Sequence, residues 1–193
     1  SGLHAAIAGG FGTVVTMPNT NPVVSSADMA LQIDKEASAY GLARVIQTVS
    51  ITKDFEGTDI SHLDELDGHF IPVITEDGHD VASAAVMLDG MTVASKKGIV
   101  VSCHCEDNEL AKKARPFRVK ALDLMEKYHL PAWGGSFDDM DEIPDEVFDE
   151  IDSYLTRAND ILALAEDTAT ARNIAIARLA DCHVHLAHVS TAN

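Results

Sequence analysis

Apolar, β-branched runs alternate with segments of helical periodicity along the chain, and this alternation restricts the fold more than any other feature of the sequence. A strand is predicted at each apolar run, over 13–17, 43–52, 69–78, 99–103 and 183–190. Helices are predicted between them, over about 25–40, 81–97, 107–129, 138–152 and 166–181. The strands lack clean polar–apolar alternation, which is typical of a parallel sheet covered on both faces. Both a Rossmann-like sheet and a (β/α)8 barrel fit this order of elements.

Local signals predict where several helices begin and end. Ser25 and Asp28 resemble a capping box, and Gly98 stands where a C-cap glycine belongs. Asp80 is predicted to be the N-cap of the helix over 81–97, and Pro144 suits a first-turn position. The helical spacing of apolar residues through 138–152 predicts a solvated amphipathic helix in an acidic insertion over about 131–160; a calcium site or a basic partner is the alternative.

The charge balance excludes some classes of partner. The chain has 31 Asp and Glu against 14 Lys and Arg, a formal net charge of −17, so nucleic acid and anionic membranes are not expected as partners. No apolar run reaches the roughly 20 residues that span a bilayer. The three cysteines, Cys103, Cys105 and Cys182, are an odd number without C-x-x-C spacing, which favours a reducing, cytoplasmic setting. We interpret them as small buried apolar residues rather than a redox pair.

Ligand-type side chains follow four of the five predicted strands. Asn19 follows the first strand, Glu76 and Asp77 lie near the end of the third, His104 follows the fourth, and His188 lies near the end of the fifth. Carboxyl ends of parallel strands converge on one rim, so we expect these side chains to meet there. One strand-end histidine alone is more often structural than a ligand. Two imidazoles and a carboxylate together suit zinc, and a bound ion would provide hydroxide near neutral pH.

Strand alternation also predicts which neighbouring side chains point away from this rim. Cys103 and Cys105 should face away from His104. His183 and His185 should lie on the face opposite His188, where we assign them to packing or helix contacts.

Four motifs in this order, "GGFGTVVTMPNTNP", "ITEDG", "VVSCHCED" and "HLAHVST", resemble the dihydroorotases of the amidohydrolase superfamily, type-I bacterial branch. The resemblance covers 1–193 except the acidic segment. It implies a (β/α)8 TIM barrel with one or two zinc ions that interconverts N-carbamoyl-L-aspartate and L-dihydroorotate in pyrimidine biosynthesis. It also implies that His104 and His188 bind zinc, that Asp77 replaces the bridging carbamylated lysine of related enzymes, and that Asn19 binds the substrate carboxylate.

Two motifs of that family are missing from the sequence. The H-x-H-x-R of the first strand would lie before Ser1, and the general-base aspartate of the eighth strand beyond Asn193. The chain is therefore expected to be the central part of one barrel domain, strands two to six of eight. It should be inactive on its own and bind zinc poorly, because a closed barrel needs about 250 residues.

The resemblance also suggests partners and alternatives. Besides a small-molecule substrate, we expect homo-oligomers, with aspartate transcarbamoylase as a candidate partner. An allantoinase or dihydropyrimidinase is the alternative enzyme. A non-catalytic dihydroorotase-like scaffold is the alternative from another class.

Overall fold

The computed structural model describes residues 2–130 and 143–191, which form two compact units. The first unit comprises the chain up to Cys105 together with Thr170–Val189, and the second comprises Glu106–Ala169 and the residues from Ser190. The first unit contains α1 (Gly2–Ala8), β1 (Thr13–Thr16), α2 (Ala27–Ser38), β2 (Arg44–Gln47), β3 (Val49–Ser50), short 3₁₀ turns at Lys53–Phe55 and Ser61–Glu65, β4 (Val73–Thr75), α3 (Ala84–Lys97), β5 (Val100–His104) and β6 (Val184–Ala187).

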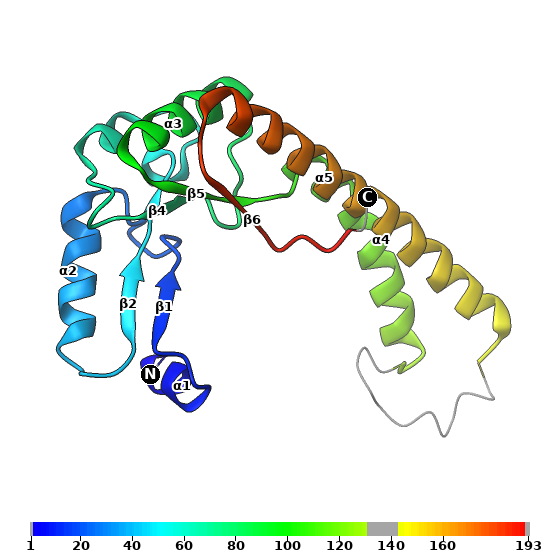
Figure 1. Ribbon diagram of the computed structural model, residues 1–193. Helices are drawn as coiled ribbons and strands as arrows, with labels where there is room; N and C mark the ends of the chain where they lie inside the picture. The colour runs from blue at the N-terminus through cyan, green and yellow to red at the C-terminus, as the bar shows by residue number, and fades with distance from the viewer. Residues whose placement is uncertain (1, 131–142, 192–193) are drawn as a thin grey trace. The chain divides into compact units, whose positions relative to one another are not determined.

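The strands of the first unit are all parallel, as predicted. β1 pairs with β2 (Figure 1). β3, β4, β5 and β6 pair in that order. The second predicted strand is divided at Thr48, whose backbone N–H donates to Thr16 O at 3.1 Å. All five predicted strands are therefore present; β5 is shifted by one residue from its apolar run, and the others are shorter than theirs.

The core of this unit lies between the sheet and the helices that cover it. Met87, Met91 and Ala94 of α3 are buried against the 3₁₀ turns and the strands. Alternate strand residues, among them Ile74, Val101 and Cys103, belong to the same core. Cys103 and Cys105 are buried, as predicted for small apolar residues, whereas Cys182 is only half-buried. Burial raises the pKa of the Cys103 thiol to about 12, so it remains protonated at neutral pH.

Helix ends follow the predicted signals in some places and depart from them in others. Gly98 is the C-cap of α3 with φ 67°, as predicted. The N-cap of α2 is Ser26, one residue beyond the predicted Ser25. The prediction that Asp80 caps α3 is wrong: α3 begins at Ala84, because the Ser83 hydroxyl accepts a hydrogen bond from Val86 N and caps it instead.

The second unit contains α4 (Asn108–Lys127) and the first part of α5 (Asp145–Ala180). Two separate helices were expected over 138–152 and 166–181, but α5 is continuous for 36 residues. The intervening residues contain neither glycine nor proline, so nothing interrupts the helix. Val147 and Ile151 pack against Ala121 of α4. The first part of the predicted insertion, residues 131–142, which includes the start of its predicted helix, lies outside the described residues.

Asp107 caps α4, with its Oδ1 accepting from Glu109 N at 3.0 Å and Leu110 N at 2.9 Å. Within the described ranges, no helix has both the length and the apolar character needed to cross a bilayer.

Candidate active site

Four side chains from the carboxyl ends of four strands form a continuous row in the first unit. Asn19 Nδ2 donates to Asp77 Oδ2 at 2.8 Å, and Asp77 Oδ1 lies 3.4 Å from His188 Nε2. The His188 ring meets the His104 ring edge-on, with centroids 5.4 Å apart. The structure thus brings together all four residues that the strand-end pattern singled out.

Strand alternation explains how β4 and β5 direct their side chains. Val100 and Ser102 of β5 line a pocket together with Val73 of β4, whereas Val101 and Cys103 belong to the core. Asp77 continues the pocket-facing series of β4 and lines the same pocket. The prediction that Cys103 faces away from this side therefore holds.

Alternation fails at the end of β6, where a prediction is wrong. His183 and His185 line the same pocket as His188, rather than packing on the opposite face. β6 ends at Ala187, and His188 has φ 60°, a left-handed conformation. This turn of the backbone returns His188 to the face of the two preceding histidines, because period-two alternation applies only within extended strand.

The pocket has a volume of about 450 Å³ and is lined by residues of β1, β4, β5 and β6 and of the segments next to them. Its lining combines apolar and polar side chains: Val15, Met17, Val73, Val100 and Ala187 on one hand, and Asp77, Ser102, His183, His185 and His188 on the other. A mostly apolar cavity with a few convergent polar groups is the usual form of a small-molecule site.

Glu76, the neighbour of Asp77, has a structural role. Its carboxylate accepts hydrogen bonds from Ile51 N and Thr52 N, both at 2.9 Å, and from the Thr52 hydroxyl. Burial raises the pKa of Glu76, and these hydrogen bonds oppose that shift. The carboxylate therefore ties the end of β4 to the backbone that follows β3.

Sequence reasoning missed two charged residues of α5 that contact the segments next to the site. Glu166 accepts hydrogen bonds from the backbone and hydroxyl groups of Ser190 and Thr191, at 2.6–2.9 Å. Arg172 pairs with Asp80, with 2.9 Å between Nη2 and Oδ2. No nearby sequence feature predicts either contact, because the partners lie 24 and 92 residues away in the sequence.

The donor chemistry of this row suits a divalent ion such as zinc. Asp77 Oδ1 and His188 Nε2 lie 3.4 Å apart, and a carboxylate and an imidazole are donors that zinc accepts. Nδ1 of His104 is buried and, among the described residues, has no hydrogen-bond partner. In the part of the chain that the structure describes, no group of three His, Cys, Asp or Glu side chains is placed to hold a metal. A third ligand would therefore require one side chain to move.

Comparisons with known proteins identify the family and the fold of the chain. A family model described as dihydro-orotase-like matches residues 1–130. A dihydroorotase of Aquifex aeolicus is 38% identical over 111 residues, which are 58% of this chain and 26% of that protein. A dihydroorotase of Macrococcus caseolyticus is 29% identical over 191 residues, 99% of this chain and 38% of that protein.

The fold resembles that of a solved L-hydantoinase (dihydropyrimidinase) from Arthrobacter aurescens, with a TM-score of 0.62 and 17% identity. The match covers 97% of this chain and 36% of that one. The chain thus has the α/β fold of TIM-barrel amidohydrolases, over about a third of their length. With the family model matching most of its residues, this chain belongs to the dihydro-orotase-like family.

Proposed function

We propose that the chain supplies part of the active site of a zinc-dependent cyclic amide hydrolase that interconverts N-carbamoyl-L-aspartate and L-dihydroorotate. The observation that carries the proposal is the row Asn19–Asp77–His188–His104 at the strand ends. Membership of the dihydro-orotase-like family supports the choice of substrate. The chain spans only about a quarter to two fifths of the relatives it matches, so the activity is assigned to the complete gene product.

Asp77, His104 and His188 are the residues that would hold zinc. When bound, the ion would lower the pKa of a water molecule and make hydroxide available near neutral pH. Carboxylate and neutral imidazole are ligands that zinc accepts. His183 and His185 line the pocket next to His188 and keep this part of it polar.

Asn19 would orient two groups at once. An amide nitrogen has two protons to donate, and one of them already bonds Asp77 Oδ2 at 2.8 Å. That bond holds the carboxylate so that its other oxygen faces His188. The second proton remains available for a substrate carboxylate, although an amide cannot neutralise an anion and a cationic group from elsewhere would complete the binding.

The test combines metal analysis with turnover of the complete gene product. We expect zinc and dihydroorotate hydrolysis in the wild type, and loss of both in Asp77→Asn and His188→Ala. Loss of an outer partner of a zinc ligand alone costs about 10–100-fold, so the loss of a ligand should cost more. His69→Gln, at an exposed histidine whose ring contacts Phe70, is the matched control. Full activity in both site variants would refute the assignment.

A hydantoinase or dihydropyrimidinase is the second candidate, because the similar solved structure bears that name. Hydantoin, dihydrouracil and allantoin assayed beside dihydroorotate separate these activities. A non-catalytic scaffold, for example beside aspartate transcarbamoylase, predicts no turnover of any of them. The presence of Asp77, His104 and His188 together favours an enzyme.

A further inference from the structure

The loop between β4 and α3 carries Asp77 and has no regular secondary structure. It runs from Glu76 to Ser83, because α3 begins only at Ala84. Within it, Gly78 has φ 78° and Asp80 has φ 27°. A positive φ is unfavourable for a residue with a side chain, and it persists only where the surroundings hold the backbone. Contacts from outside the loop must therefore fix Asp80.

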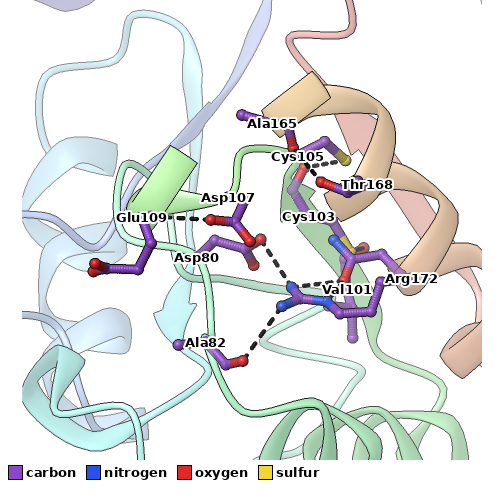
Figure 2. Close-up of polar contacts among 11 residues, drawn as sticks. Asp80, Ala82, Val101, Cys103, Cys105, Asp107, Glu109, Ala165, Thr168 and Arg172 are labelled. Carbon is purple, nitrogen blue, oxygen red and sulfur yellow. Dashed lines mark hydrogen bonds and ion pairs between the residues drawn. The ribbon is translucent and has the colours of Figure 1, made fainter. Parts of the chain in front are cut away.

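Arg172 of α5 provides those contacts (Figure 2). Its Nη2 lies 2.9 Å from Asp80 Oδ2, and its Nη1 lies 3.5 Å from Ala82 O. The Asp80 side chain is only 4% exposed and that of Arg172 25%. Arg172 is itself held, since its Nε and Nη2 donate to the buried Asn173 Oδ1 at 3.2 and 3.0 Å. A guanidinium fixed on a helix thus holds the loop at two points.

Asp77 lies between two anchored acids of this loop. On its N-terminal side, Glu76 is buried and bonds the backbone of Ile51 and Thr52. On its C-terminal side, Asp80 is buried and pairs with Arg172. Only Gly78 and His79 separate Asp77 from Asp80. Release of either anchor would let the Asp77 carboxylate move relative to Asn19 and His188.

We propose that Arg172, acting through Asp80, is a positioning residue that sets the place of the Asp77 carboxylate in the site. The catalytic consequence rests on the proposed function, whereas the ordering of the loop does not. Among the described residues, the hydrogen bonds and the ion pair of Arg172 go to Asp80, Ala82 and Asn173 and to none of the four side chains of the row. Its effect on Asp77 would therefore pass through the backbone of residues 77–80.

The experiment compares hydrogen–deuterium exchange and kinetics in the complete gene product. The variants are Arg172→Gln, Arg172→Lys, Asp80→Asn and the double variant Arg172→Gln/Asp80→Asn. The double variant removes the pair without leaving one buried charge unpaired. Arg178→Gln, at an exposed arginine of the same helix, is the matched control.

Faster exchange in a peptide covering 76–82 is expected for Arg172→Gln, Asp80→Asn and the double variant, and not for Arg178→Gln. With dihydroorotate, kcat should fall by about 100-fold, the scale of a 1 Å misplacement, with KM changed less than roughly twofold. The double variant should be no worse than Arg172→Gln, because both changes break one pathway. Arg172→Lys keeps the charge but cannot bond the loop at two points, so its exchange rate and its kcat should lie between those of the wild type and Arg172→Gln.

Exchange at 76–82 that stays equal to the Arg178→Gln control would overturn the proposal, as would additive losses in the double variant. If Arg172→Gln does not fold, the double variant and Arg172→Lys decide the same question. A gene product without any cyclic amide hydrolysis would refute the proposed function but not the role of Arg172. The exchange measurement would still show whether Arg172 orders the loop.

Discussion

At the scale of single residues, the environments of two buried acids, Asp80 and Glu166, shift their pKa values in opposite directions. Burial raises the pKa of Asp80 to about 6, although the Arg172 guanidinium opposes the shift. Burial also acts to raise the pKa of Glu166, but hydrogen bonds from Ser190 and Thr191 outweigh it and lower the pKa to about 2. Glu166 is therefore ionised at neutral pH, and it bonds Ser190 and Thr191, the residues that directly follow Val189 in the sequence.

Glu166→Gln should change how stability depends on pH. The pKa of Glu166 is lowered from 4.5 to about 2 on folding, so its contribution is fully present above the unfolded value and is lost as pH falls through the folded one. The wild type should exceed Glu166→Gln in unfolding free energy at about pH 7, and the difference should shrink toward about pH 3. Urea denaturation measures it.

Asp160→Asn, at an exposed position of the same helix, is the control and should show little of this dependence. A wild-type advantage that stays constant with pH would contradict the role given to the Glu166 carboxylate.

At the scale of elements, the best-predicted features are those that depend on neighbouring residues. The strands follow apolar β-branched runs, and α3 ends at a glycine in a left-handed conformation, with Lys96 and Lys97 in its last turn. Gly98 N donates to Ser95 O at 3.1 Å and Ile99 N to Ala94 O at 2.9 Å. These two bonds satisfy carbonyls at the end of the helix and direct the chain into β5.

Gly98→Ala should therefore destabilise the protein by roughly 1–2 kcal/mol, the cost of a Cβ in the left-handed conformation. Gly98→Asn should lose less, because asparagine tolerates this region better. Gly12→Ala, where an added Cβ would meet nothing within 4 Å, is the control. Chemical denaturation of the three variants gives the comparison, and equal losses at Gly98 and Gly12 would contradict the assignment.

At the scale of the whole molecule, the described strands form a two-stranded sheet that ends at β1 and a four-stranded sheet that ends at β6, so each of these two strands has one neighbour. An unpaired strand edge is a template for pairing with another chain. Val15 of β1 is 44% exposed, and Val189 just beyond β6 is 47% exposed. The formal net charge of −17 opposes contact between copies, and salt screens that repulsion.

The 193-residue chain should consequently self-associate, more strongly as salt is added. Val15→Lys should weaken this association by placing a charge on the edge, whereas Leu31→Lys, at an exposed leucine of α2, should leave it unchanged. Light scattering over a concentration series tests both. A monodisperse monomer at high concentration and high salt would contradict the prediction.

Local periodicity let the sequence alone determine the order of strands and helices, the parallel sheet, and the convergence of Asn19, Asp77, His104 and His188. Those inferences needed only residue spacing and the rule that parallel strands end on one rim. Sequence could not place His183 and His185, because the left-handed turn at His188 breaks strand alternation.

Only the tertiary structure decided which distant residues the charged side chains pair with. Asp80, predicted as a helix cap, pairs with a guanidinium 92 residues away, and Glu166 bonds residues 24 positions along the chain. Helical spacing identifies which residues share a face, but not what that face meets. Burial and partner distance, which fix the ionisation of these acids and the position of the loops beside them, exist only once distant segments have packed together.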